Sequence, residues 1–148
     1  MDPSNRLFND VVRALSMVLD FDEGEKLYHA WRTAVLAHGI AVELKLPEPG
    51  LLYHAGLLHD IGAIGLPDHI IHVVHRGDAR KQVQQHAELG ARIVQPFGVL
   101  RRIAPIIQDH HERFDGLGFP SGKTGAEISL ETQVLAAADT LEIGRAHV

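Results

Sequence analysis

One ordered set of histidines and carboxylates stands out in this sequence. An imidazole or a carboxylate within an apolar helix is costly unless it is paired or bound to a metal ion, and most of this set lies in or beside apolar helical patterns. Five imidazoles and two carboxylates that converge can bind two metal ions and leave positions for water and a substrate. This chemistry is metal-assisted hydrolysis. The set is His29, His59, Asp60, His86, His110, His111 and Asp139.

Adjacent ligands are informative because of where their helices must end. On an ideal helix the side chains of His59 and Asp60 point about 100° apart, so both can serve one centre where the helix stops. Gly62 indicates that it stops there. An aspartate can then bridge two metal ions while its histidine neighbour binds one, and the pair His110–His111 can act in the same way at another helix end.

Two carboxylates extend the set. Asp139 follows the small residues Ala136–Ala138, which let helices pack closely, so its charge requires a cation. Glu25 lies one helical turn before His29 on the same face, where it can add an eighth ligand and a third metal ion. The alternative for Glu25 is an exposed acid favoured by the helix dipole. Nitrogen and oxygen ligands without sulfur suit iron, manganese, zinc or nickel and do not discriminate among them.

Composition limits the classes of function. The chain has 148 residues, 45% hydrophobic and 22% charged, which is typical of one soluble globular domain. The net charge of −5 and scattered basic residues argue against a groove for long nucleic acid, although bound metal ions can still attract a small anion. The chain has no cysteine, which excludes disulfides, thiolate metal sites and cysteine nucleophiles and suits the cytoplasm. It shows no membrane-spanning run and no signal pattern.

Apolar spacing predicts an all-α fold, a single domain of five to seven helices, because no stretch alternates convincingly with period two. Pro105 should kink its helix or begin a new one. The glycine-rich segment 113–125 should form a long loop with a functional role. Ser129 should cap the last helix, with Glu131 in its first turn. Helices are expected at about residues 5–19, 25–46, 50–61, 68–75, 83–95, 100–111 and 129–143.

Four segments resemble the HD-GYP branch of the HD-domain phosphohydrolases. Their order and spacing agree from about residue 25 to residue 142. The pattern HHExxDGxG(Y/F)P is highly specific because it is eleven positions long and follows an HD motif at the expected separation. The segments are HDIGAIGLPDHII (59–71), HAELGARIV (86–94), HHERFDGLGFP (110–120) and VLAAADTLE (134–142).

The resemblance implies an HD-domain helical bundle over residues 25–148, preceded by a helix and turn at 1–24. Truncation of this domain at its C-terminus is left open. It also implies two or three divalent metal ions, usually iron or manganese, with zinc, nickel or magnesium as further options. The implied reaction is hydrolysis of the bacterial messenger cyclic di-GMP to pGpG or GMP, with Asp60 as the catalytic, bridging ligand. The implied metal ligands are Glu25, His29, His59, Asp60, His86, His110, His111 and Asp139.

The chain departs from the family pattern in four places. Ala63 stands where the family usually has a lysine that would touch the ligand phosphate. Phe119 replaces the tyrosine of the family name and keeps the ring without the hydroxyl, and Gln133 occupies a position that is often arginine. The sequence ends at Val148, where the family continues with basic residues and further helices. The expected metal set is therefore complete while the substrate-binding set is depleted.

Four charged residues near the glycine-rich loop are weaker candidates. Arg113 and Lys123 flank the loop and can meet a substrate phosphate, or they are simple surface charges. Glu112 and Asp115 are expected to hold ligating histidines by the second ring nitrogen, or to shape the loop, because such histidines need a partner there. The alternative for both carboxylates is solvation.

Three functions compete at this point. The first is a cytoplasmic, metal-dependent phosphodiesterase for a cyclic dinucleotide. The second is a degenerate HD-GYP domain that binds metal and signals through protein contacts, and the third is an HD phosphohydrolase for another nucleotide or phosphate ester. The expected partners are a small phosphoester, a regulatory domain, or a second copy bound through the amphipathic first helix. Long nucleic acid and membrane are not expected.

Overall fold

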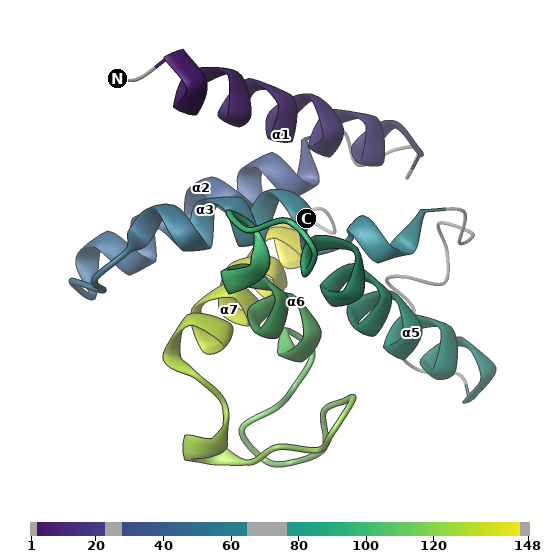
Figure 1. Cartoon of the computed structure of the whole chain (residues 1–148). Helices are drawn as coiled ribbons and strands as arrows, with labels where there is room; N and C mark the ends of the chain where they lie inside the picture. Colours follow the sequence, from purple (N-terminus) through teal and green to yellow (C-terminus); the bar gives the residue numbers. More distant parts are fainter. Residues whose placement is uncertain (1–2, 23–27, 65–76, 146–148) are drawn as a thin grey trace.

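The structure is a computed structural model that describes residues 3–22, 28–64 and 77–145 (Figure 1). Within these ranges six α-helices and three short 3-10 helices form, and β-structure is limited to one isolated bridge. This confirms the all-α expectation. The α-helices are α1 (Pro3–Asp22), α2 (His29–Glu43), α3 (Pro49–Leu58), α5 (Gly77–Val94), α6 (Ala104–Asp109) and α7 (Leu130–Arg145), and the 3-10 helices are η1 (Ile61–Ala63), η2 (Arg101–Ile103) and η3 (Gly125–Glu127).

The helices α2 and α3 form the centre of the fold. They pack against each other, with α1 on one side and α7 on the other, while α5 packs against η1 and α6 (Figure 1). Close approach of α2 and α3 depends on small residues, because a Cβ atom on Gly56 would lie 2.4 Å from the Cα atom of Ala34. No described helix is both long and apolar enough to span a membrane.

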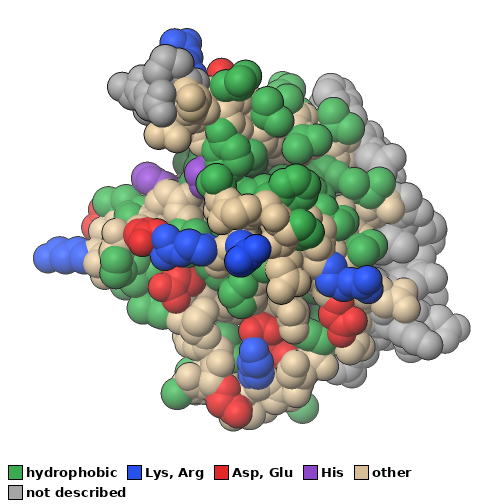
Figure 2. Space-filling view, viewed as in Figure 1, with side chains coloured by type: hydrophobic (Ala, Val, Ile, Leu, Met, Phe, Trp, Pro, Cys, Tyr) green, Lys and Arg blue, Asp and Glu red, His purple; other side chains and the backbone are tan. Residues whose placement is uncertain are grey.

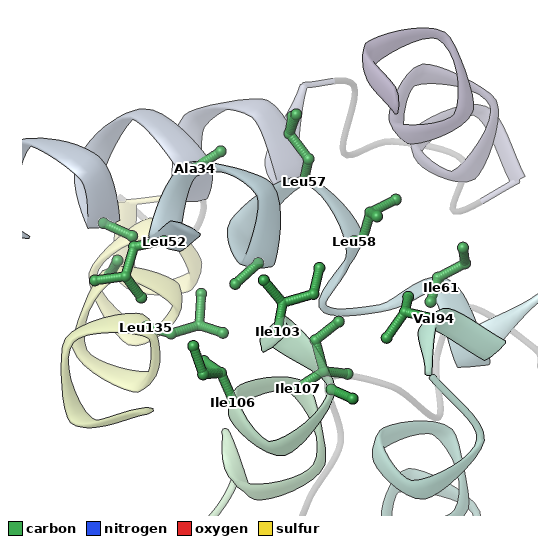
Figure 3. Packing of buried hydrophobic residues seen from close by; sticks show 14 of the residues in the cluster. Ala34, Leu52, Leu57, Leu58, Ile61, Val94, Ile103, Ile106, Ile107 and Leu135 are labelled. Carbon is green, nitrogen blue, oxygen red and sulfur yellow. The ribbon is translucent and has the colours of Figure 1, made fainter. Parts of the chain in front are cut away.

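The hydrophobic core lies between α3, α6 and α7. Figure 3 shows Leu52, Leu58, Ile103, Ile107 and Leu135 in one cluster of buried side chains from these helices and their neighbours. All five side chains are fully buried. At about 1.5–3 kcal/mol for each buried aliphatic side chain, this cluster fixes the relative positions of the helix ends that carry the histidines.

Helix α2 is shorter than the predicted helix at residues 25–46. It begins directly after Tyr28, whose φ of 69° is left-handed. It ends in a Schellman turn, in which Lys45 has a φ of 55° and the Leu46 N–H donates to the carbonyl of Ala41 at 2.9 Å. A lysine is unusual at a position that favours glycine, so the turn itself could not be predicted, although Pro47 and Pro49 mark the end of the helix a few residues later.

Other boundaries differ from the predictions in informative ways. Helix α3 stops at Leu58, so that a turn carries the next two residues before η1 begins. Helix α5 begins at Gly77, ahead of the predicted start at residue 83. Pro105 lies in the first turn of α6, so it begins a new helix after η2. The Thr132 N–H donates to Ser129 Oγ at 3.2 Å, which confirms the predicted cap of α7. The helix expected at 68–75 lies outside the described residues.

Candidate metal centre

Seven predicted ligands converge on one buried region from five separate parts of the fold. His29 begins α2, and Asp139 lies on α7. The pair His59–Asp60 occupies the turn between α3 and η1, because α3 ends ahead of the predicted end at residue 61. His86 lies on α5, and the pair His110–His111 directly follows α6. All seven are buried apart from His111, which is half-buried. Glu25 lies outside the described residues.

The first ligand group joins α2, the turn after α3, and α7. One donor atom from each of His29, His59 and Asp139 lies within 4.8 Å of the other two. The Oδ1 atom of Asp139 is 3.2 Å from His29 Nε2 and 3.5 Å from His59 Nε2. Three protein donors are the number that a catalytic metal site uses when it leaves a position for water or substrate.

The second ligand group joins α5 to the end of α6. His86 Nε2 lies 3.5 Å from His110 Nε2 and 3.3 Å from His111 Nε2. A neutral imidazole has one lone pair and one N–H, so three mutually facing ring nitrogens cannot all satisfy one another. A cation placed among them would accept all three lone pairs.

Asp60 stands between the two groups and presents one oxygen to each. Its Oδ2 atom is 2.9 Å from His59 Nε2 and 3.8 Å from His29 Nε2. Its Oδ1 atom is 3.2 Å from His86 Nε2 and 3.9 Å from His110 Nε2. A carboxylate in this position could bridge two metal ions, one in each group.

Backbone carbonyls orient two of the ligand rings. His59 Nδ1 donates to the carbonyl oxygen of Gly56 at 2.8 Å, and His110 Nδ1 donates to that of Ile107 at 2.5 Å. When Nδ1 carries the proton, a neutral ring presents its lone pair at Nε2, toward the centre. At His59 and His110 the partner of the second ring nitrogen is thus a backbone carbonyl of the preceding helical turn, and not the carboxylate of Glu112 or Asp115.

The charges around Asp60 favour a cation in the first group. Burial alone lowers the pKa of His59, but the charges and contacts of Asp60 and Asp139 outweigh it and raise this pKa well above 6.5. Burial alone raises the pKa of Asp60, but His59 and then His86 hold it well below its ordinary value. Contacts with His29 and His59 likewise outweigh burial and lower the pKa of Asp139. Positive charge is thus stabilised between the two carboxylates.

Two rings of the second group, His110 and His111, have the opposite balance. Burial, followed by the charges of His86 and His59, lowers the pKa of His110 to about 4. Burial, followed by the charges of His110 and His86, holds the pKa of His111 well below 6.5. Both rings are therefore neutral at pH 7, which is the protonation state in which imidazole binds a metal ion.

The donor atoms themselves indicate that a metal ion fits. His59 Nε2 and Asp139 Oδ1 are buried, and within the described part of the chain neither has a hydrogen-bond partner of acceptable geometry. Buried polar atoms are seldom left unsatisfied. An ion bound by the first group would give both atoms a partner, and nitrogen and oxygen donors of this kind suit a divalent transition metal.

Glu112 shapes the glycine-rich loop and does not reach a ligand ring through any contact that the structure gives it. Its buried carboxylate accepts hydrogen bonds from the backbone N–H groups of Ser121 at 2.6 Å and Lys123 at 3.0 Å. It therefore ties the end of α6 to the returning part of the loop, in line with the loop-shaping alternative.

The other three charged candidates pair with one another or with α6. Arg113 donates to Asp115 through Nε at 3.0 Å and Nη2 at 2.5 Å, and this pairing lowers the pKa of Asp115 to about 2. Asp115 is exposed and also accepts a hydrogen bond from the Leu117 N–H at 3.0 Å within the loop. These contacts agree with the loop-shaping alternative rather than with support of a ligating histidine. Lys123 Nζ lies 2.5 Å from Asp109 Oδ2. Both proposed phosphate contacts, Arg113 and Lys123, are already engaged by a carboxylate.

The contact of Phe119 with a candidate ligand was not predicted from the sequence. Its buried ring lies against His111, with ring centroids 4.8 Å apart and planes inclined by 34°. The loop reaches this position because it crosses itself closely: a Cβ atom on Gly118 would lie 2.3 Å from the backbone nitrogen of Arg113. An aromatic residue directly after a glycine in the loop was the available signal, but its contact with a ligand ring depends on the tertiary path of the chain.

The fold and the site define a helical domain with a buried histidine–aspartate cluster whose donor atoms could hold metal. The family model of the HD domain matches residues 13–146, and the chain belongs to this family, as the HD-GYP motifs indicated. The expected boundary at residues 24 and 25 stays a prediction.

Named relatives share the domain. The 3'3'-cGAMP-specific phosphodiesterase 3 of Vibrio cholerae is 31% identical over 136 residues, which cover 89% of this chain and 30% of the relative. A cyclic di-GMP phosphodiesterase of Thermotoga maritima is 32% identical over 139 residues, which cover 90% of this chain and 38% of the relative. The chain thus spans about a third of the length of these curated relatives.

A solved structure shares the fold. The crystal structure of a cyclic GMP-AMP-specific phosphodiesterase of V. cholerae aligns with a TM-score of 0.77 at 20% sequence identity. The alignment covers 93% of this chain and 41% of that one. This agreement confirms the HD-domain helical fold.

Proposed function

We propose that this chain is the catalytic domain of a metal-dependent phosphodiesterase that hydrolyses a cyclic dinucleotide. The observation that carries the proposal is the position of Asp60, with one carboxylate oxygen facing each ligand group. Relatives that match most of this chain are named phosphodiesterases for 3'3'-cGAMP and cyclic di-GMP, which supports this substrate class. Hydrolysis to pGpG or GMP belongs to the same proposal.

In this proposal, His29, His59 and Asp139 hold one divalent ion, and His86, His110 and His111 hold the other. The bound ions supply Lewis acidity that activates water and stabilises charge on the phosphate. Burial keeps His110 and His111 neutral, and backbone carbonyls orient the rings of His59 and His110. Iron or manganese is the proposed metal, and the ligands also suit zinc, nickel or magnesium. A third ion at Glu25 stays a prediction.

The test combines two measurements on one anaerobically purified sample. We expect two or more metal ions per chain and conversion of cyclic di-GMP or 3'3'-cGAMP to linear product. Turnover of a generic aryl phosphodiester without turnover of either cyclic dinucleotide would replace the substrate class with another phosphate ester. A protein that binds no metal ion would contradict the proposal entirely.

A second candidate is a metal-binding domain that signals without hydrolysis. Ala63 favours it, because this residue is buried where the family usually places a phosphate-binding lysine. The carboxylates that engage Arg113 and Lys123 reduce the cationic surface further. The same experiment separates the candidates, since this one predicts stoichiometric metal without any linear product.

A homodimer through α1 belongs to the proposal as well. Leu7, Val11 and Val18 are 67%, 50% and 65% exposed, and their spacing is that of a coiled-coil seam. Hydrophobic side chains gather on the upper part of the molecule in Figure 2, where α1 lies. A second copy would supply the matching seam.

Sedimentation equilibrium should show a dimer that Val11→Asp converts to monomer, whereas a monomeric wild type would contradict the proposed homodimer. A regulatory partner domain and a cytoplasmic location stay predictions.

A further inference from the structure

An ion pair adjoins the first ligand group without belonging to it. Arg32 lies one helical turn beyond His29 on α2, and Glu142 lies one turn beyond Asp139 on α7. Arg32 Nε donates to Glu142 Oε1 at 2.5 Å, and His29 Nε2 lies 3.2 Å from Asp139 Oδ1. Both contacts join the same two helices and are offset by three residues on each. The ion pair therefore fixes the register in which the two ligands meet.

The burial of this pair is unequal. Glu142 is 3% exposed, whereas the Arg32 side chain is 40% exposed. A carboxylate removed from water is costly unless a cation compensates it, and loss of the cation leaves an uncompensated buried charge. The Arg32 guanidinium can be hydrated, whereas the buried Glu142 carboxylate cannot. Loss of the pair would therefore affect α7 most at Glu142, one helical turn from Asp139.

The buried face of α2 offers few large side chains that could fix its register against a neighbouring helix. Apart from His29 and Thr33, the buried positions of α2 are all alanines. Small side chains allow helices to approach closely, but they interlock less than large side chains and resist sliding less. A directional hydrogen bond between charged groups restores a defined register at an interface of this kind.

The second ligand group shares no element with this pair. His86 lies on α5, and the pair His110–His111 follows α6. A change in the register of α2 against α7 would therefore separate His29 from Asp139 while it leaves the three other rings in place.

We propose that Arg32 and Glu142 are positioning residues that set the affinity of the metal position formed by His29, His59 and Asp139. This inference rests on the proposed two-metal centre. We expect the pair to affect only the metal position formed by His29, His59 and Asp139. A general contribution to stability would instead weaken both metal positions. Partners of metal ligands typically change metal affinity by about 10- to 100-fold when they are removed.

The experiment is an anaerobic Mn²⁺ titration of the metal-free 148-residue chain by calorimetry. Wild type should show two sites. Glu142→Gln should weaken one site by about 10- to 100-fold and leave the other unchanged. In a His29→Ala background, where the supported position is already lost, Glu142→Gln should have no further effect. The matched control is Glu48→Gln, which removes the exposed partner of Arg102 in a pair with the same 2.5 Å separation.

A second variant keeps the test valid if Glu142→Gln fails to fold, which far-UV circular dichroism would reveal. Arg32→Lys retains the charge at the exposed end of the pair and should weaken the same site by a smaller factor. Equal weakening of both sites, or no weakening of either, would overturn the inference while the two-metal proposal stands. A wild-type chain that binds no Mn²⁺ would overturn both.

Discussion

Asp60 shows how a single residue can define a centre. Its two oxygens lie 2.9 Å from His59 Nε2 and 3.2 Å from His86 Nε2, so its carboxylate contacts ligands from both groups. We predict that Asp60→Ala abolishes hydrolysis and lowers the metal content without unfolding the domain, because both positions lose a shared ligand. Metal analysis and circular dichroism of the same sample test this.

The control for that substitution is Asp115→Ala, which removes a carboxylate that pairs with the exposed Arg113. It should retain wild-type metal content and turnover. A full complement of metal and wild-type turnover in Asp60→Ala would refute the bridging assignment.

Phe119 is the second residue whose role depends on its contact with a ligand. Its ring packs on His111, so Phe119→Ala should leave that imidazole free to rotate and should lower the free energy of unfolding by about 3–5 kcal/mol. Phe119→Tyr preserves the stacking ring and is the matched control. Urea denaturation and metal content measure the two effects. Metal affinity equal to wild type in the alanine variant would mean that stacking does not hold His111.

At the scale of elements, the close approach of η1 to α5 brings Asp60 to His86. A Cβ atom on Gly62 would lie 2.0 Å from the carbonyl oxygen of His86 and 2.4 Å from the backbone nitrogen of Gly90. We therefore predict that Gly62→Ala forces the two elements apart, costs about 1–3 kcal/mol of stability and weakens metal binding.

Gly39→Ala is the control for this backbone contact. Gly39 lies in α2, and nothing lies within 4 Å of the position that an alanine Cβ atom would occupy there. Alanine should therefore raise stability by up to about 1 kcal/mol through helix propensity. Thermal unfolding measures the melting temperatures of both variants for comparison with wild type. Equal melting temperatures for Gly62→Ala and wild type would show that η1 can shift without cost.

The elements also show what sequence reasoning can reach. Apolar spacing located the α-helices in the described part of the chain, and Pro105 and Ser129 marked real helix starts, because these signals are local. The boundary at Tyr28 and the Schellman turn at Lys45 were missed, since both use left-handed residues other than glycine. The Arg32–Glu142 pair was missed because its partners are 110 positions apart and each resembles an ordinary surface charge on its own helix.

At the scale of the molecule, the ligand types followed from sequence but their grouping did not. The motif around His59 and the pair at His110–His111 are contiguous, so their chemistry can be inferred from the chain alone. Which ring faces which carboxylate depends on how α2, α5 and α7 pack. For the same reason, Asp115 could not be separated from true partners of the histidines until its bond to Arg113 was located.

Because five separate parts of the fold supply the ligands, metal binding should stabilise the whole domain. A ligand that binds only the folded state at 1,000 times its dissociation constant contributes about 4 kcal/mol. In a domain of this size each kcal/mol corresponds to roughly 2–4 °C in Tm. Removing one such ion should therefore lower Tm by roughly 8–16 °C, and restoring Mn²⁺ to the chelated protein should reverse the loss.

The matched comparison is Asp60→Ala, which should show a much smaller difference in Tm between its metal-loaded and chelated forms. If chelation left the Tm of the wild type unchanged, the convergent side chains would be a pre-packed cluster that holds itself together without metal. In that case protonated His59, whose pKa Asp60 and Asp139 raise well above 6.5 against the effect of burial, would be the cation that compensates the two buried carboxylates.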